Sequence, residues 1–224
     1  MKQVIRAAYR AALREDFLAK TLDRAAALCR DRLAEEQAAG RLMTGGVFRH
    51  KKLLFAYMEY LTEDAAFQPA PLADALLAPL APFLCTWPEI TGPAKWAYMY
   101  PVFWTDEPQS PESWARRLPP DARCGRIAVL YPDKLFSYVC HHQALVAEGL
   151  LRGDRYQFIS QHENLLFSYF ETPRDRERVN IRRSDAPSQE IDRWKAVNPA
   201  KHFYHFPEAD GADFLVIDTL ISVG

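Results

Sequence analysis

The sequence lacks an excess of charge of either sign. Its 28 lysines and arginines face 29 aspartates and glutamates, which gives a formal net charge of −1. A chain with so little net charge has no long-range field that would draw in nucleic acid or an anionic membrane. Arginines cluster between residues 174 and 183, but acidic residues alternate with them, as is typical of a solvated loop. We therefore expect neither nucleic acid nor a membrane as a partner.

Long apolar runs and closely spaced cysteines are missing as well. No stretch reaches the roughly 18 uninterrupted apolar residues of a membrane span, and the nearest, Pro71–Leu84, is interrupted by prolines and by Asp74. The N-terminal residues show no apolar segment of a secretory signal. The four cysteines have no CxxC spacing, which favours reduced, packed thiols over a zinc site or a disulfide framework. These absences predict a cytoplasmic protein without a bound metal.

What the sequence does contain is an internal repeat. Residues 50–60 read HKKLLFAYMEY and residues 162–172 read HENLLFSYFET, so that a histidine, two leucines, a phenylalanine, a tyrosine and a glutamate recur at a constant offset of 112 positions (from 50 to 162). The order of the surrounding segments recurs too. Each half is predicted to hold a strand, a long helix, a hairpin of two strands, a shorter helical stretch and a final strand.

The expected elements can be placed along the chain. In the first half they cover residues 3–11, 14–40, 42–48 with 53–61, 72–84 and 95–104. In the second half they cover residues 126–130, 132–153, 155–160 with 165–172, 188–197 and 213–222. Four prolines make residues 105–123 a connector, which Trp114 and Leu118 could pin to the body. The domains are therefore expected at residues 1–104 and 124–224.

This element order predicts the fold class. Strand–helix–strand–strand–helix–strand is the ferredoxin-like order, in which two helices cover one face of an antiparallel sheet. The fold class is thus α+β: two tandem ferredoxin-like units with their sheets packed face to face as an intrachain α+β barrel. Because one chain would supply both sheets, we expect a viable monomer, with weak homodimerisation left open.

A tyrosine and a histidine stand out on the long helix of the second half. Tyr138 and His142 are four residues apart, so their side chains lie on the same helix face, and this face is the apolar stripe that points at the sheet. The adjacent His141 falls on the flank of the helix. A histidine at such a position is often a satisfied core residue, and a small-molecule pocket is the competing interpretation.

Three motifs of the second half resemble the L-rhamnose mutarotase family. They are YPDKLFSYVCHH (residues 131–142), RYQFISQHENLLFSYFE (residues 155–171) and DRWKAVNP (residues 192–199). The resemblance covers about a third of the chain. It implies a member of the dimeric α+β barrel superfamily that opens and closes sugar rings without a cofactor.

The resemblance also implies roles for single residues. His142 would be the general acid/base, since the ordinary pKa of histidine suits proton exchange near neutral pH, and Tyr138 would be its hydrogen-bonding partner. Trp194 would offer an aromatic face to the sugar, and Tyr156 would supply a hydroxyl. His141 is a weaker candidate for substrate binding. The expected ligand is a small, sugar-like molecule.

The first half and one insertion depart from this pattern. Counting back by 112 places Ala26 and Arg30 opposite the Tyr138–His142 pair, or Ala25 and Cys29 if one gap is allowed, so the first half is expected to be structural. Residues 173–187 insert charge that the family lacks. Two alternatives to an isomerase stay open, namely a cofactor-independent oxygenase and a non-catalytic binding protein. A solvent-open cavity lined by the predicted residues would favour the isomerase, and a wholly apolar cavity the oxygenase.

Overall fold

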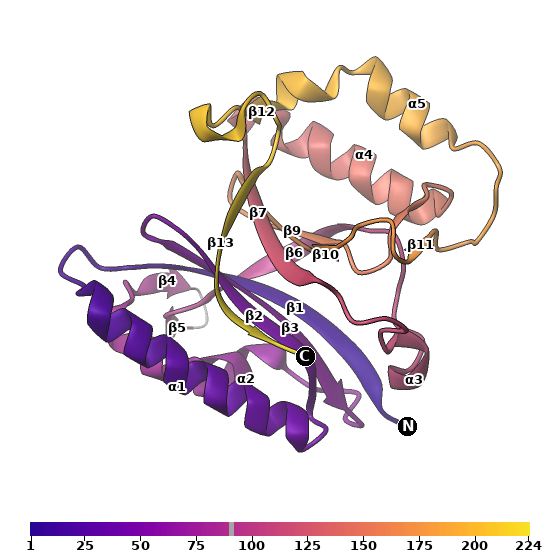
Figure 1. Ribbon diagram of the computed structural model, residues 1–224. Coiled ribbons are helices and arrows are strands. Elements are labelled where there is room, and N and C mark those ends of the chain that lie inside the picture. Colours follow the sequence, from indigo (N-terminus) through magenta and orange to yellow (C-terminus); the bar gives the residue numbers. More distant parts are fainter. Residues whose placement is uncertain (90–91) are drawn as a thin grey trace. The chain divides into compact units, whose positions relative to one another are not determined.

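The computed structural model describes residues 1–89 and 92–224, which form two compact units (Figure 1). Unit 1 comprises Met1–Met99, Pro108–Ala115 and Asp218–Gly224, and unit 2 comprises Tyr100–Glu107 and Arg116–Ile217. Each unit contains an antiparallel sheet and helices. The predicted α+β class and the repeated strand–helix order are confirmed.

Unit 1 is built around a long antiparallel pair of strands. Its elements are β1 (Gln3–Ala12), α1 (Ala19–Ala38), β2 (Leu42–His50), β3 (Leu53–Thr62), α2 (Pro69–Leu76), the 3₁₀ turn η1 (Ala78–Phe83), β4 (Trp87–Glu89), β5 (Gly92–Ala94) and α3 (Pro111–Trp114). β1 and β3 pair along their whole length. The buried stripe of α1, which runs from Leu22 to Leu33, packs on the apolar side chains of this sheet because helical spacing brings it to one face.

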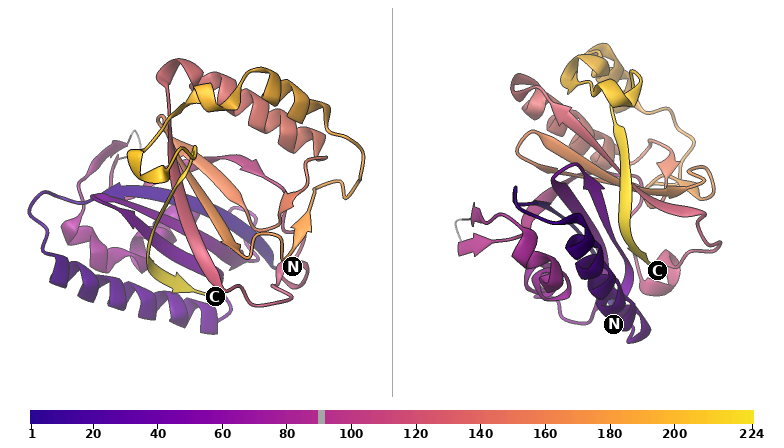
Figure 2. Two further views of the ribbon diagram at one scale, coloured as in Figure 1. Left: turned by 45° about the horizontal axis from the view of Figure 1, so that its top comes forward. Right: turned by 60° about the vertical axis from the view of Figure 1, so that its left-hand side comes forward.

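Unit 2 repeats this plan. Its elements are β7 (Ala122–Leu130), η2 (Pro132–Lys134), α4 (Leu135–Glu148), β8 (Gly153–Asp154), β9 (Phe158–His162), β10 (Leu165–Thr172), β11 (Arg178–Val179), α5 (Gln189–Ala196), η3 (Pro199–His202), β12 (Phe203–Tyr204) and η4 (Pro207–Ala209). α4 and α5 lie side by side over one face of its sheet (Figure 2). The core between helices and sheet includes Ala128, Leu130, Leu145 and Leu166.

Two strands contribute to both units. β6 (Ala97–Trp104) pairs with β1 through residues 97–99 and with β9 through its later residues. β13 (Leu215–Val223) pairs first with β7 and then with β2. The hydrogen-bonded order β10-β9-β6-β1-β3-β2-β13-β7 returns to β10, which is the antiparallel pairing pattern of a closed eight-stranded barrel.

Several predicted bounds need correction. The first long helix begins at Ala19 rather than at residue 14, because residues 13 and 14 still donate backbone hydrogen bonds to Lys52 and Phe83. The second ends at Glu148 rather than at residue 153, because Gly149 adopts φ +67° and closes the helix with a bond to the carbonyl of Leu145.

Smaller departures have similar local causes. The predicted helical stretch at residues 72–84 is divided into α2 and η1, and η1 contains Pro82. The strand predicted at residues 155–160 begins later, at Phe158, and residues 153–154 pair instead with β11. The connector contains α3, whose Trp114 is fully buried as suggested, whereas Leu118 is exposed. Among the described residues, no helix is long and apolar enough to cross a membrane.

Candidate functional site

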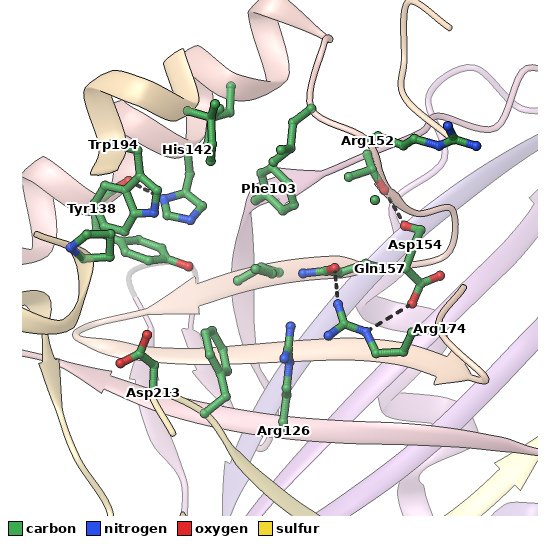
Figure 3. A pocket seen from close by; sticks show the side chains of 18 of the residues that line it. Phe103, Arg126, Tyr138, His142, Arg152, Asp154, Gln157, Arg174, Trp194 and Asp213 are labelled. Atoms are coloured by element: carbon green, nitrogen blue, oxygen red, sulfur yellow. Dashed lines mark hydrogen bonds and ion pairs between the residues drawn. The ribbon is translucent and has the colours of Figure 1, made fainter. Parts of the chain in front are cut away.

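A cavity of about 470 Å³ lies within unit 2 (Figure 3). Helices α4 and α5 form one wall, and side chains from β6, β7 and β9 form the other. The size is that of a small-molecule site, which typically occupies about 300–1,000 Å³. The two ends of the cavity differ: one is aromatic and aliphatic, and the other carries charged side chains.

Tyr138 and His142 stand together at the apolar end. Both belong to α4 and are buried, and their rings stack with centroids 3.8 Å apart. The Nδ1 atom of His142 lies 2.9 Å from the backbone carbonyl of Tyr138. Because a carbonyl oxygen only accepts, Nδ1 must carry the proton, and the lone pair of a neutral ring is then on Nε2.

Burial sets the charge of this histidine. Removal from water lowers the pKa of His142 to about 4, and the hydrogen bond to the Tyr138 carbonyl only partly opposes this effect. The imidazole is therefore uncharged at neutral pH. Its Nε2 atom can accept a hydrogen bond but is only a weak base, since a group of such low pKa binds a proton weakly.

The Tyr138 hydroxyl is buried without a hydrogen-bond partner in the part of the chain that the structure describes. Burial raises the pKa of Tyr138 well above that of a free tyrosine, so the hydroxyl keeps its proton. A buried hydroxyl normally finds a partner, because leaving one unpaired costs about 1–3 kcal/mol. In Figure 3 this hydroxyl points into the cavity. A bound molecule could supply the missing partner.

Aromatic side chains hold this pair in place. Trp194 of α5 meets Tyr138 and His142 edge to face, with ring centroids 5.7 and 4.9 Å away. Phe103 of β6 approaches His142 in the same manner at 5.5 Å. Such packing fixes the orientation of both rings. Leu145, Ile159, Phe203 and Phe214 complete the apolar lining.

The charged end was not foreseen from the sequence. Arg126 of β7 and Asp154 of β8 line it together with Gln157 and Arg174. Arg174 donates to the Gln157 side chain at 2.7 Å, and its Nε lies 3.8 Å from the Asp154 carboxylate. Burial raises the pKa of Asp154 to about 6, while burial and the charge of Arg174 lower the pKa of Arg126 to about 10. The one signal in the sequence was a lone arginine at the head of the apolar run 126–130.

Two of the predicted site residues do not line the cavity. The hydroxyl of Tyr156 bonds to Glu177 at 3.1 Å, and the guanidinium of Arg116 lies 4.1 Å over its ring. His141 is half-buried on the flank of α4, where its ring lies 5.5 Å from that of Trp194. The structure therefore brings together Tyr138, His142 and Trp194 and leaves the other two outside.

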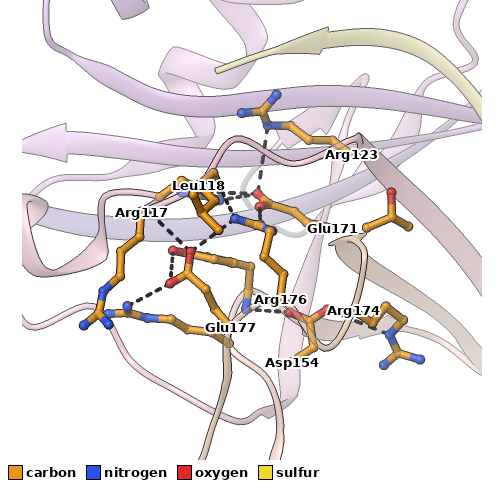
Figure 4. Close-up of polar contacts among 12 residues, drawn as sticks. Arg117, Leu118, Arg123, Asp154, Glu171, Arg174, Arg176 and Glu177 are labelled. Atoms are coloured by element: carbon orange, nitrogen blue, oxygen red, sulfur yellow. Dashed lines mark hydrogen bonds and ion pairs between the residues drawn. The ribbon is translucent and has the colours of Figure 1, made fainter.

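Tyr156 instead belongs to a network of ion pairs that the inserted residues 173–187 help to build (Figure 4). The buried carboxylate of Glu171 accepts from Arg116 at 2.7 Å and from Arg176 at 2.5 Å. Arg176 also contacts Glu177, which in turn pairs with Arg155 at 3.3 Å. This network fastens the insertion to unit 2. Within residues 1–89 and 92–224, no three His, Cys, Asp or Glu side chains are grouped so that they could hold a metal ion.

Comparison with known proteins finds similarity to solved structures at low sequence identity. No protein-family profile and no curated protein sequence matches the chain, so the resemblance to L-rhamnose mutarotases finds no support there. Among solved structures, a proposed monooxygenase of Fusobacterium nucleatum aligns over 98% of this chain and 94% of its own, with 7% identity and a TM-score of 0.43. A similar protein of Lactobacillus acidophilus aligns over 98% and 95%, with 8% identity and a TM-score of 0.41. A proposed chlorite dismutase aligns over 97% and 94%, with 12% identity and a TM-score of 0.38.

Proposed function

We propose that unit 2 is a small-molecule enzyme of the cofactor-independent oxygenase type, acting on a planar, largely apolar substrate with an acidic hydroxyl group. The observation that carries the proposal is the pairing of an unpartnered Tyr138 hydroxyl with a neutral His142 at the apolar end of one cavity. The hydroxyl can donate a hydrogen bond, and Nε2 can accept one. The single hydroxyl of a phenol or an enol can serve both: its oxygen accepts from Tyr138, and its proton is donated to Nε2 of His142.

The low basicity of His142 favours such a substrate. A phenolic hydroxyl has a pKa of about 10, so a weak base assisted by a hydrogen bond can help it to ionise. The resulting anion is electron-rich and can reduce molecular oxygen itself. For a methylene carbon conjugated to that anion, CH₂ becomes C=O, and the second oxygen atom leaves as water with the two hydrogens. The substrate supplies all four electrons.

A neutral sugar fits the cavity less well. Ring opening needs an acid/base near pH 7, and burial keeps His142 far from that range. A sugar also presents hydroxyls in every direction. The charged end of the cavity could bind some of them, but around Tyr138 and His142 the carbon surfaces of Phe103, Leu145, Trp194 and Phe203 offer no hydrogen bonds. The cavity is nevertheless neither wholly apolar nor filled, so the mutarotase activity implied by the resemblance is kept as an arm of the test.

The test is oxygen consumption by the full chain with a panel of enolisable 1,3-diketones and of phenols that carry a conjugated ring methylene. Tyr138→Phe and His142→Gln are expected to lower turnover by about 10²–10⁴-fold. Cys140→Ser and Tyr131→Phe are matched controls, because both residues are exposed and neither lines the cavity. Both controls should retain full turnover.

Anomer exchange, followed by saturation-transfer NMR on a panel of aldoses, runs in parallel with the same variants. If the wild type accelerates exchange and consumes no oxygen with any compound, the oxygenase proposal is wrong and the mutarotase interpretation replaces it. Equal oxygen consumption by the wild type and His142→Gln would also contradict the proposal.

A second candidate function, haem binding, is favoured by the tautomer of His142. A neutral imidazole with its Nδ1 proton held by a backbone carbonyl is the form that ligates metals through Nε2, and haem iron is commonly held by such a histidine. Haem would bring its own redox chemistry. Titration of the protein with hemin tests this candidate: a shifted Soret band that disappears in His142→Ala and persists in Cys140→Ser would support it.

A further inference from the structure

Arg126 is a cation without a fixed counter-charge. It lies in the middle of β7 and lines the cavity. In the described chain, its only hydrogen bond is a long one of 3.3 Å from Nε to the Ser168 hydroxyl, and no carboxylate lies within ion-pair distance. Its guanidinium rests over the rings of Phe214 and Phe170, at 4.6 and 5.3 Å. Its outer nitrogens are left for something else to bind.

Two carboxylates of the cavity wall contact groups other than Arg126. Asp154 accepts the backbone N–H of Tyr156 at 3.1 Å and faces Arg174. Asp213, also on the cavity wall, lies 3.8 Å from the Nδ1 of His205. Burying a charged group without a partner is costly, because hydration is lost and nothing replaces it. An unpaired arginine facing a cavity is therefore a reason to look for an anion.

The fold itself does not require a cation at this position. In unit 2, Arg126 pairs across the sheet with Ser168. The same register in unit 1 pairs Tyr9 with Ala56, and residue 56 corresponds to residue 168 by the offset of the repeat. Tyr9 is fully buried in the core of unit 1. In unit 1, a buried aromatic residue thus occupies the position that Arg126 holds in unit 2.

We infer that Arg126 anchors an anionic group, a carboxylate or a phosphate, on the molecule that the cavity binds. This inference rests on the proposed function, since it describes the same ligand. The substrate class is then an aromatic or conjugated acid that carries its hydroxyl at the Tyr138 end and its anionic group at the Arg126 end. Arg174, oriented by Gln157, adds a second positive charge beside the anion.

Calorimetric titration of the full chain with three matched probes tests the inference. 2-Naphthoate and 2-naphthyl phosphate carry the anionic group, and 2-naphthamide is the uncharged counterpart of the first. Hydrogen bonds to a charged group contribute about 1.5–3 kcal/mol, so wild type should bind at least one anion about 10-fold to 100-fold more tightly than the amide. The preferred anion identifies the carboxylate or the phosphate as the natural group.

Variants separate the anchor from the rest of the cavity. Arg126→Met should weaken binding of the preferred anion by about 10-fold to 100-fold and change the affinity for the amide by less than about 2-fold. Arg193→Met is the control, since Arg193 is exposed on α5, pairs with Glu190 and does not line the cavity. It should behave as wild type.

The outcomes separate a failure of the Arg126 anchor from a failure of the proposed function. Equal affinity of the wild type for acid and amide would overturn the anchor while leaving a small-molecule site, and this comparison needs no variant to fold. Loss of amide and acid binding alike in a folded Arg126→Met would also overturn it, because the residue would then shape the cavity rather than select charge. If none of the three probes binds to wild type, the proposed function fails and the anchor fails with it.

Discussion

Two buried ionisable groups of the cavity should affect stability in opposite directions when the pH is lowered. His142 has a folded-state pKa of about 4, below the 6.5 of an unfolded chain. Its contribution to stability is complete above pH 6.5 and is lost as the pH falls toward 4. Asp154 has a folded-state pKa of about 6, above its ordinary value near 3.9. The contribution of Asp154 to stability is complete below about pH 3.9 and is lost as the pH rises through 6.

The magnitudes follow from linkage. Between pH 7 and pH 5, protonation of His142 in the unfolded state removes about 2 kcal/mol from the free energy of unfolding. Over the same interval, protonation of Asp154 in the folded state returns about 1 kcal/mol. The two effects partly cancel in the wild type, and each becomes fully visible when the other group is replaced by an amide.

The measurement is urea unfolding at pH 7 and pH 5, followed by circular dichroism and extrapolated to water. On this change of pH, His142→Gln should lose about 2 kcal/mol less stability than wild type, and Asp154→Asn about 1 kcal/mol more. Each variant is compared with itself at the two pH values, so a general loss of stability does not matter. If His142→Gln shows the wild-type pH dependence, the imidazole is not held neutral by burial, and the argument about its weak basicity is wrong.

Other substitutions test individual contacts by the same unfolding assay. Glu171→Gln should cost about 3 kcal/mol, because it removes the buried charge that pairs with the guanidinium groups of Arg116 and Arg176, whereas Asp185→Asn on the surface should be neutral. Ser188→Ala removes the hydroxyl that caps α5 and should cost about 1 kcal/mol. Gly149→Ala should cost about 1–2 kcal/mol, since φ is +67° and the added Cβ would meet a neighbouring arginine at 2.9 Å. Tyr138→Phe should leave stability unchanged or raise it by about 1 kcal/mol, because the lost hydroxyl has no partner. A marked loss in Tyr138→Phe would mean that the hydroxyl is bonded in the protein itself.

The fold could be predicted from sequence because its signals are local and occur twice. The match between residues 50–60 and 162–172 falls on β3 and β10, and the elements around both follow the expected order. The bounds that were wrong depend on backbone details that periodicity does not carry. Gly149 ends α4 through its own conformation, and residues 13–14 stay extended because Phe83 and Lys52 offer carbonyls to them.

The candidate site was predictable in part, for a related reason. Tyr138 and His142 are neighbours by helix geometry alone, and Trp194 reaches them because α5 packs beside α4. Arg126 and Asp154 come from strands far apart in sequence, and nothing local shows that both face the same cavity. Tyr156 carried a hydroxyl in the expected motif, but the inserted segment provides Glu177 as its partner.

The two units differ by an exchange of side-chain size between helix and sheet. In unit 1, Arg30 is exposed while Ala25 and Cys29 are buried, so the gapped register places small side chains where unit 2 has Tyr138 and His142. Tyr9 takes up room on the sheet side of unit 1, at the position that Arg126 holds in unit 2. Small residues of the helix and a large residue of the sheet thus share the core of unit 1. In unit 2, Tyr138 and His142 on the helix and Arg126 on the sheet bring polar groups to the corresponding place. Apolar neighbours cannot form hydrogen bonds with these groups. Unit 1 has neither a histidine nor an arginine at these positions, so the shared scaffold does not require them. This difference supports the proposal that a ligand pairs with His142 and Arg126 in unit 2.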